Sequence, residues 1–378
     1  MRVEPVVKAD AYGHGLLPVA RHLAARGADG LSVATFDEAL ALRDAGIEAP
    51  VLVLYPIPPR LAVEAAERRI ALTVGDPELF HHILRAVEDR TGGPELHVQL
   101  ELETGLGRGG FAPKDAVAAA RSLQATDRIV VDGAWSHLAA PADPDRSAVQ
   151  GARYESTLSL LAEDGIAIGT RHLAASGGLV AGTASSFDAV RPGLIIYGVI
   201  PDDLSGLSSP LVAELQPVMS LHARPVRVID LPAGWGISYG PSFTTTRPSR
   251  IATLPIGYGD GWPRVLSNIA SALVRGGRVP LVGTVAMDAV MADVTDVPGS
   301  PVSVDDEFTL LGRQGNERID AGELARLRTT ISWEVTTGMS LRLPRVYHAA
   351  AGTLGLRTLT AAEDRWLGSN SGTAISAT

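Results

Sequence analysis

One lysine stands where a strand would deliver an amine to a site. Lys8 ends the apolar, β-branched run Val6–Val7 and is followed by Tyr12 and by Gly13 and Gly15. Glycines permit a tight turn of the backbone, and a lysine placed in this way suits a Schiff base to an aldehyde cofactor. The alternative is a solvated lysine at the mouth of a barrel strand. The spacing alone leaves both interpretations open.

Length and composition define the broad class of the protein. The chain has 378 residues, 46% of them hydrophobic, which predicts a soluble protein of two domains. Its formal charge of −9 is dispersed without a long basic run, so we expect no nucleic-acid partner. The absence of cysteine excludes disulfides, thiol nucleophiles and cysteine metal sites, and we predict no bound metal.

The chain also lacks the sequence signals of a membrane or secreted protein. No apolar run approaches the roughly 20 residues of a membrane-spanning helix. The start, Met-Arg-Val-Glu-Pro, has no apolar centre of a signal peptide. We therefore expect a cytoplasmic protein without a membrane partner.

Up to about residue 200, short β-branched runs alternate with alanine-rich helical stretches such as Leu17–Arg26 and Phe36–Ala45. This alternation indicates parallel strands joined by crossover helices. Eight such units predict an α/β fold, a (β/α)8 TIM-type barrel. The expected strands lie near Glu4–Ala9, Leu31–Ala34, Val51–Leu54, Ala71–Val74, Leu96–Leu102, Val131–Trp135, Arg171–Ala174 and Leu194–Gly198.

After about Pro217 the pattern changes to alternating strands separated by Gly and Pro turns, which predicts a mostly β C-terminal domain. Its expected strands include Ser220–Val228, Ile251–Ile256, Val279–Val285 and Glu307–Leu311. The predicted domains are therefore 1–216 for the barrel and 217–350 for the β domain. Residues 351–378 are expected to form a tail, disordered over Gly368–Thr378.

Several residues fall where barrel strands end, which is where barrel enzymes hold their chemistry. Arg108 lies in a glycine-rich turn after the fifth strand, His137 follows the sixth, and Arg191 precedes the eighth. Ser176, Gly193 and Leu194 supply small residues and free backbone N–H groups where such barrels commonly bind a phosphate. Taken singly, each feature has a structural alternative: a turn, a satisfied histidine or a surface ion pair. Jointly they favour a site.

In the β domain, tyrosines lie in two glycine-rich turns, Trp235–Gly240 and Ile256–Arg264. Tyrosines in such turns often only cover a core, and the spacing does not select one of them. The segments Ile237–Gly240, Gly257–Gly261, Gly283–Asp288 and Leu343–Tyr347, together with the Lys8 segment, resemble in order the motifs of the alanine racemase family. The resemblance runs almost to residue 350.

The resemblance implies a dimeric enzyme that uses pyridoxal 5'-phosphate and racemises a small amino acid. Lys8 matches the lysine that binds the cofactor and acts as one acid/base. Tyr239 of the partner subunit matches the second acid/base, across a shared active site. Two bases on opposite faces of Cα would allow protonation from either side.

The resemblance also assigns further contacts. Arg191 matches the arginine at the pyridine nitrogen, and His137 a histidine that couples this arginine to the tyrosine. Arg108 matches a contact to the cofactor's phenolic oxygen and the substrate carboxylate, and Met287 one whose backbone N–H meets that carboxylate. The phosphate contacts it implies are Tyr12, Ser176, Gly193 and Leu194.

Some positions depart from the family pattern. Glu101 stands where many members have a carbamylated lysine, and we expect its carboxylate to orient Arg108 instead. Trp333, Thr284 and Ala175 replace a tyrosine, an arginine and an asparagine of the family. The chain also begins almost at the lysine motif, before which members usually have a strand and a helix.

These observations favour an isomerase that interconverts L-alanine and D-alanine and supplies D-alanine for peptidoglycan. One alternative is a racemase of another small amino acid such as serine. A second is a related barrel decarboxylase, against which the Ser-Tyr-Gly and Met-Asp segments argue. A third is a cofactor-binding pseudoenzyme, which would bind pyridoxal phosphate without exchanging the α-proton.

Overall fold

Short apolar segments in the first part of the chain form a parallel sheet of eight strands in the computed structural model. Every residue of β2, β3 and β8 is buried, as expected when both faces of a parallel sheet are covered, whereas both residues of β1 are exposed. The strands are β1 (Arg2–Val3), β2 (Leu31–Val33), β3 (Val51–Val53), β4 (Ile70–Val74), β5 (Leu96–Glu101), β6 (Ile129–Trp135), β7 (Thr170–Ala175) and β8 (Ala189–Arg191).

The sheet returns to its own first strand. The strand order is β1-β8-β7-β6-β5-β4-β3-β2, and an isolated parallel bridge joins Val6, just after β1, to Ser32 in β2. The amide of Ser32 donates to the carbonyl of Pro5 (2.9 Å), and the amide of Val7 donates to Ser32 (2.8 Å). The (β/α)8 fold predicted from the sequence is confirmed.

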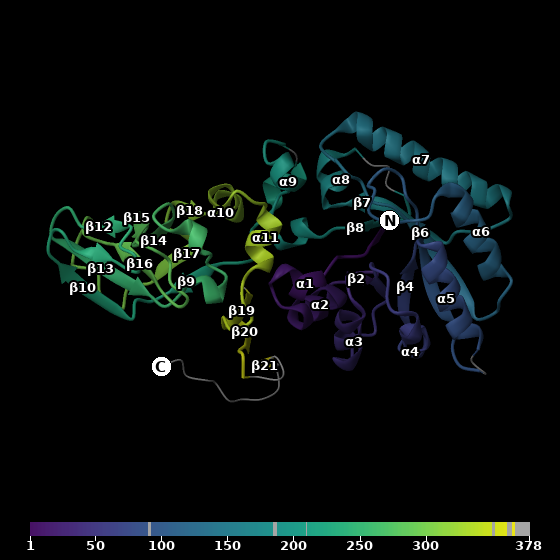
Figure 1. Ribbon diagram of the computed structural model, residues 1–378, viewed down its shortest axis with the longest axis horizontal. Coiled ribbons are helices and arrows are strands. Elements are labelled where there is room, and N and C mark those ends of the chain that lie inside the picture. The colour runs from purple at the N-terminus through teal and green to yellow at the C-terminus, as the bar shows by residue number, and fades with distance from the viewer. Residues whose placement is uncertain (90–91, 184–186, 209, 350–351, 361–364, 367–378) are drawn as a thin grey trace. The chain divides into compact units, whose positions relative to one another are not determined.

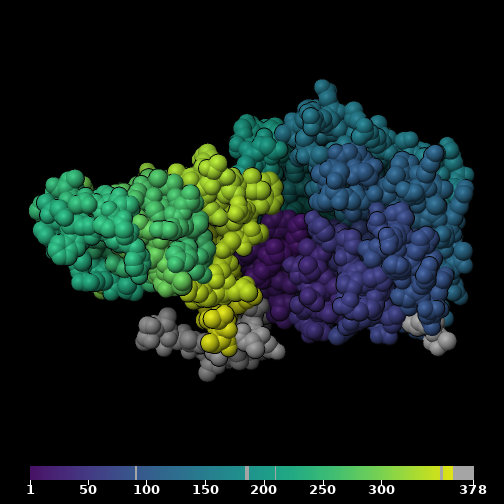
Figure 2. All heavy atoms as spheres, viewed as in Figure 1, coloured from purple at the N-terminus to yellow at the C-terminus, as the bar shows by residue number. Residues whose placement is uncertain are grey.

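Helices follow the strands and lie outside the sheet (Figure 1). In α5, the buried residues Phe80, Ile83 and Val87 share one helix face, and Figure 2 shows side chains filling the spaces between the helices on the visible face. The helical elements are α1 (Lys8–Tyr12), α2 (Leu16–Ala25), α3 (Phe36–Asp44), η1 (Pro59–Leu61), α4 (Ala62–Glu67), α5 (Pro77–Glu88), α6 (Pro113–Gln124), α7 (Pro144–Glu163), α8 (Ser176–Ala181), η2 (Leu194–Tyr197), η3 (Asp202–Leu204) and α9 (Pro210–Glu214).

Two predicted strands were wrong in position. The first ends at Val3 rather than Ala9, because only Arg2 and Val3 pair with β8. Val6 makes a single bridge to Ser32, and the backbone is left-handed from Ala9 onward. The eighth is Ala189–Arg191, and the apolar run Leu194–Tyr197 forms a 3₁₀ turn after Pro192 and Gly193. Arg191 is therefore the last residue of β8 and does not precede that strand.

The structure describes residues 1–89, 92–183, 187–208, 210–349, 352–360 and 365–366. The chain divides into two units, Met1–Gln216 and Pro217–Thr378. Among the described residues, no helix is long and apolar enough to cross a membrane.

The second unit is mostly β, as predicted. Its main sheet is antiparallel, in the order β10-β13-β16-β15-β14-β17-β18, with β9 on β17. Its elements are β9 (Leu221–Ala223), β10 (Arg227–Leu231), β11 (Gly236–Ile237), β12 (Phe243–Thr244), β13 (Ser249–Leu254), η4 (Tyr258–Asp260), η5 (Arg264–Leu266), β14 (Ser271–Val274), β15 (Gly277–Val282), β16 (Val290–Asp293), β17 (Phe308–Gln314), β18 (Glu317–Ile319), α10 (Ala321–Arg328), α11 (Ser332–Thr337), β19 (Arg345–Ala349), β20 (Gly352–Arg357) and β21 (Arg365–Trp366).

Two expectations for this unit need adjustment. The strand predicted over Ser220–Val228 is divided at Pro225, which cannot donate to a sheet, so β9 pairs with β17 and β10 with β13. The expected tail contains β20, which pairs with β19. Gly368–Thr378, predicted to be disordered, lies outside the described residues.

Candidate active site

Lys8 opens a left-handed turn. Ala9, Asp10, Ala11 and Tyr12 all have φ between 53° and 55°, a conformation that costs an L-residue roughly 1–2 kcal/mol. Local hydrogen bonds offset part of this cost. The Glu38 carboxylate accepts the amide of Ala9 (2.6 Å), the Asp10 carboxylate accepts that of Leu16 (2.8 Å), and the His14 ring contacts the carbonyls of Ala11 and Tyr12. Such strain persists where its surroundings determine it, often at functional sites.

The amine of Lys8 lies in a cationic environment. Its Nζ is 6.0 Å from the centre of the Tyr55 ring, and the guanidinium carbon of Arg108 is 5.5 Å from the same ring. Burial, followed by the charge of Arg108, lowers the pKa of Lys8, whereas Glu38 opposes the shift. A lowered pKa increases the neutral fraction of the amine, the form that attacks an aldehyde. The chain has one other lysine, Lys114, which is exposed in α6.

Arg191 ends β8 as an enclosed cation, with 2% of its surface exposed. Its guanidinium donates to the carbonyls of Ser136 (2.6 Å) and His172 (3.1 Å) and to Nδ1 of His172, and it lies 4.8 Å from the centre of the Trp135 ring. Burial lowers the pKa of Arg191 to about 10, so the side chain stays charged at neutral pH.

His172 is a part of this arrangement that the sequence did not predict. Because a guanidinium only donates, Nδ1 of His172 accepts, and its ring proton lies on Nε2, facing Oε1 of Gln99 at 2.5 Å. Burial and the charge of Arg191 lower the pKa of His172, so the ring is neutral. The only signal in the sequence is a histidine within a predicted strand, which also fits an ordinary core residue.

The predicted phosphate contacts come together after β7 and β8. Oγ of Ser176 accepts the amides of Gly193 (2.8 Å) and Ile195 (3.4 Å). A Cβ at Gly193 would lie 2.5 Å from the hydroxyl oxygen of Tyr12, so this close approach requires glycine. Leu194 is buried at the start of η2. Tyr12, Ser176 and Gly193 therefore form one polar cradle at the strand ends, with Leu194 next to Gly193 in the chain. The N–H of Gly193, predicted to be free, is bonded to Ser176 in the structure.

Arg108 lies in the loop after β5, and its side chain is 40% exposed. Its Nη2 is 3.6 Å from Oε1 of Glu101, the buried last residue of β5. Burial raises the pKa of Glu101, whereas the charge of Arg108 opposes this shift. After β6, burial and then the charges of Arg191, Arg108 and Lys8 lower the pKa of His137 to about 3. His137 is therefore neutral at physiological pH.

In the second unit, Tyr239 and Met287 are on exposed turns. Tyr239 is 75% exposed and follows Ser238, whose φ is 65° and whose hydroxyl donates to the carbonyl of Thr284 (2.6 Å). Met287 is 52% exposed, and Arg342 holds its turn through an ion pair with Asp288 (2.6 Å). Both side chains are available to a ligand or to another molecule.

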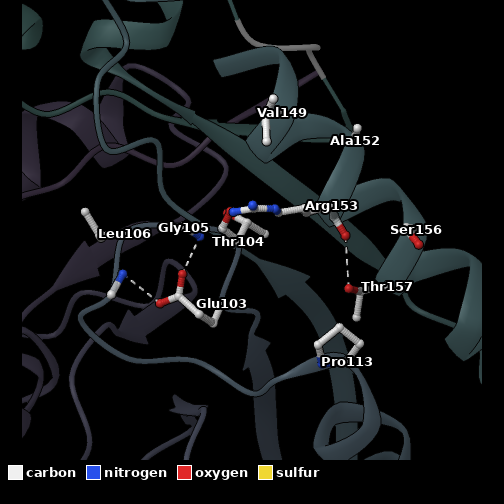
Figure 3. Close-up of a pocket in the computed structure, with 11 residues that line it drawn as sticks. Glu103, Thr104, Gly105, Leu106, Pro113, Val149, Ala152, Arg153, Ser156 and Thr157 are labelled. Atoms are coloured by element: carbon white, nitrogen blue, oxygen red, sulfur yellow. Dashed lines mark hydrogen bonds between the residues drawn. The ribbon is translucent and has the colours of Figure 1, made fainter. Parts of the chain in front are cut away.

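A groove of about 870 Å³ lies between the β5–α6 loop and α7 (Figure 3). None of the predicted site residues lines it. Its lining residues are Glu103, Thr104, Gly105, Leu106, Gly107, Pro113, Val149, Ala152, Arg153, Ser156 and Thr157.

Comparison with known proteins finds matches to one family over both units. The protein-family model for the alanine racemase N-terminal domain matches residues 1–201. The family model for the C-terminal domain matches residues 218–347. The chain belongs to the alanine racemase family. As a member of this family it is a pyridoxal-phosphate-dependent isomerase, as the sequence predicted.

The relatives are similar over almost the whole chain. The alanine racemase of Symbiobacterium thermophilum is 42% identical over 348 residues, covering 92% of this chain and 90% of the relative. A solved alanine racemase from Bacillus anthracis with bound L-Ala-P has a TM-score of 0.85 and 34% identity, covering 95% of this chain and 91% of that one. A histidine racemase from Leuconostoc mesenteroides has a TM-score of 0.80 and 32% identity, covering 90% of each chain.

Proposed function

We propose that this alanine racemase family member interconverts L-alanine and D-alanine in a homodimer, using Lys8 and Tyr239 of the partner subunit as acid/base residues. The observation that carries the proposal is the position of Lys8. Its amine lies on a strained turn at the strand ends, where burial and then the charge of Arg108 lower its pKa. The same turn brings Tyr12 to the polar cradle at Gly193.

The residues at the strand ends fit pyridoxal phosphate. The close packing of Tyr12 on Gly193 leaves no room for a side chain in the cradle, and small residues with backbone N–H groups suit an anion. Tyr12, Ser176, Gly193 and Leu194 would hold the phosphate, Lys8 the aldehyde carbon and Arg191 the ring nitrogen. When bound, the cofactor withdraws electrons from Cα of the amino acid and so acidifies its proton.

The two proposed bases act on opposite faces of Cα. Lys8 takes or returns the proton on one face, and Tyr239 of the partner subunit does so on the other. An unperturbed tyrosine has a pKa of about 10 and needs positive charge nearby to act as a base at neutral pH. We assign His137 to couple the charge of Arg191 to this tyrosine. The 75% exposure of Tyr239 in its own chain supports its use by another subunit.

The substrate carboxylate would be held by Arg108 and by the backbone N–H of Met287. Arg108 also reaches the phenolic oxygen of the cofactor in this assignment. An arginine suits a carboxylate because its planar fork can donate two parallel hydrogen bonds. Glu101, 3.6 Å from Arg108, would keep that fork in one orientation.

The test is proton NMR in deuterated buffer, with purified protein and pyridoxal phosphate added to separate samples of L-alanine, D-alanine, L-serine and L-histidine. Loss of the α-proton signal from both alanine enantiomers, abolished in Lys8→Ala, is the expected result. Cofactor binding without exchange would identify a pseudoenzyme and overturn the proposal.

The histidine sample tests a second candidate substrate. A histidine racemase has a TM-score of 0.80 to this chain, so the fold is compatible with a larger side chain. Faster exchange with L-histidine or L-serine than with alanine would support the proposed racemase activity and would assign that amino acid as the preferred substrate.

For the cell, we propose that the enzyme is cytoplasmic and supplies D-alanine for peptidoglycan. Expression in a bacterial strain that requires external D-alanine checks this role. Growth without added D-alanine is expected for the native chain and not for Lys8→Ala.

A further inference from the structure

Thr104, in the loop between β5 and Arg108, is held from three directions. It is 2% exposed. Its hydroxyl lies 2.8 Å from that of Ser136, in the loop after β6, and accepts from the side-chain amide of Gln150 (3.1 Å). Its carbonyl accepts from Arg153 (3.0 Å), whose guanidinium lies beside Thr104 in Figure 3. Gln150 and Arg153 are three residues apart in α7 and so share one helix face.

Gln150 joins this loop to the next one. It is 4% exposed, and its amide makes three hydrogen bonds. Its Oε1 accepts the backbone amide of Ala139 (2.8 Å), and its Nε2 donates to the carbonyl of His137 (3.1 Å) as well as to Thr104. One side chain of α7 therefore binds both the loop of Arg108 and the backbone of His137.

The connection also reaches Arg191. Ser136, which contacts Thr104 through its hydroxyl, accepts the Nη2 donor of Arg191 through its carbonyl at 2.6 Å. The path from Gln150 through Thr104 and Ser136 to Arg191 consists of buried groups. In such surroundings an unpaired polar group is costly, so the donors and acceptors fix one another's positions.

We propose that Gln150 is a positioning residue, which holds the β5 and β6 loops in one register and so sets Arg108 and His137 relative to Arg191. This inference rests on the proposed function for the roles of those three residues. Gln150 itself touches none of the reacting atoms. Its effect on the reaction comes from orientation, to which rates are sensitive over distances of about 1 Å.

The experiment compares Gln150→Leu, Gln150→Glu and Thr104→Val with Ser156→Ala, a control on the same helix that lines the groove. Gln150→Glu keeps the acceptor for Ala139 and loses the donors to His137 and Thr104. We expect Gln150→Leu to lower kcat/KM for both alanine enantiomers by about tenfold. Gln150→Glu should lose at least as much, because its buried carboxylate faces the carbonyl of His137, and Ser156→Ala should lose nothing.

A double variant separates positioning from general loss of stability. Because Gln150 and Thr104 belong to one network, Gln150→Leu with Thr104→Val is expected to lose less activity than the product of the two single losses. If the double variant loses activity by the full product of the two single losses, the inference is overturned. Native values of kcat and KM in Gln150→Leu would also overturn it.

Hydrogen–deuterium exchange supplies a readout that does not depend on activity. In the cofactor-loaded protein, Gln150→Leu is expected to speed exchange of both loops, residues 102–111 and 136–140, and Ser156→Ala of neither. Unchanged exchange in both loops would also overturn the inference. If the native chain shows no racemisation while both loops respond to Gln150→Leu, the proposed function fails and the coupling of the loops stands.

Discussion

Arg191 remains a cation inside the first unit although its hydrogen-bond partners there are neutral. The carbonyls of Ser136 and His172 and the His172 ring accept from it, and the lowered pKa of about 10 still leaves it charged at neutral pH. A fixed positive charge near a pyridine nitrogen disfavours protonation of that nitrogen. Burial and neighbouring charge therefore determine the protonation states of side chains such as Arg191 and His172.

Glu101 offers a test of orientation by charge. Glu101→Gln is expected to raise KM for alanine and lower kcat/KM about tenfold, because Arg108 loses an ionic partner. Burial raises the pKa of Glu101, so its ionised form is disfavoured by folding at neutral pH. The amide should therefore not lower the melting temperature. Steady-state kinetics and thermal denaturation check both parts, with exposed Glu95→Gln as the control. An unchanged KM would exclude the orienting role.

The lowered pKa of His137 leads us to expect that the folded chain loses stability at acidic pH. Its pKa is about 3 in the folded chain against an ordinary value of 6.5, so between these values the unfolded chain binds a proton that the folded chain does not. Stability is retained above pH 6.5 and falls on acidification, by about 1.4 kcal/mol per pH unit for one such group.

Urea unfolding of the cofactor-free protein between pH 6.5 and 4 measures this slope. His137→Asn should reduce it, and His81→Asn, at the exposed surface of α5, should not. An equal slope in the native chain and His137→Asn would contradict the expectation.

At the element scale, strand existence was easier to predict than strand position. Six of the eight expected barrel strands overlap observed ones because their β-branched runs end at clear turns. The first and eighth differ because tertiary contacts determine the backbone there: the Val6–Ser32 bridge precedes a left-handed turn, and Leu194–Tyr197 packs as a 3₁₀ turn. A one-dimensional pattern contains neither contact.

Site residues, like strands, were predictable where a local sequence pattern marks them and not where contacts made by folding define them. Lys8, Arg108, His137 and Arg191 could be selected because they lie at or just beyond strand ends, and their roles stay predictions. His172 and Gln150 act through side-chain contacts made by folding. No spacing in the sequence marks those contacts.

The cradle after β8 gives a prediction about backbone packing. In Gly193→Ala, a Cβ would approach the Tyr12 hydroxyl to 2.5 Å, so either the tyrosine or the backbone must move. We expect at least about a tenfold weaker affinity for pyridoxal phosphate, measured by absorbance titration. Gly151→Ala in α7 meets nothing within 4 Å and should bind the cofactor normally. Equal affinities in both variants would show that the cradle tolerates the added methyl group.

At the scale of the whole molecule, the proposed acid/base residues lie in different units, Lys8 in Met1–Gln216 and Tyr239 in Pro217–Thr378. The composition and the change of pattern near Pro217 were sufficient to predict two domains. Whether a base acts in its own chain or in another cannot be deduced from one sequence, because the local pattern around Tyr239 is the same in both cases.

Mixed dimers distinguish these cases. A dimer of one Lys8→Ala chain and one Tyr239→Phe chain contains one intact site if Tyr239 serves the partner, and none if it serves its own chain. We expect each variant alone to fail in racemisation and the co-expressed, doubly tagged mixed dimer to recover up to about half the native rate. An inactive mixed dimer would assign Tyr239 to its own subunit.

The presence of only two lysines in the chain, Lys8 and Lys114, has a practical consequence for handling the protein. Amine-directed reagents such as activated esters or aldehyde resins find one exposed lysine, on α6, while arginines resist them. Such reagents also modify the exposed α-amine of Met1, so Lys114 is the attachment point among the lysine side chains. Exchanging it for arginine would leave Lys8 as the single lysine that such reagents could modify.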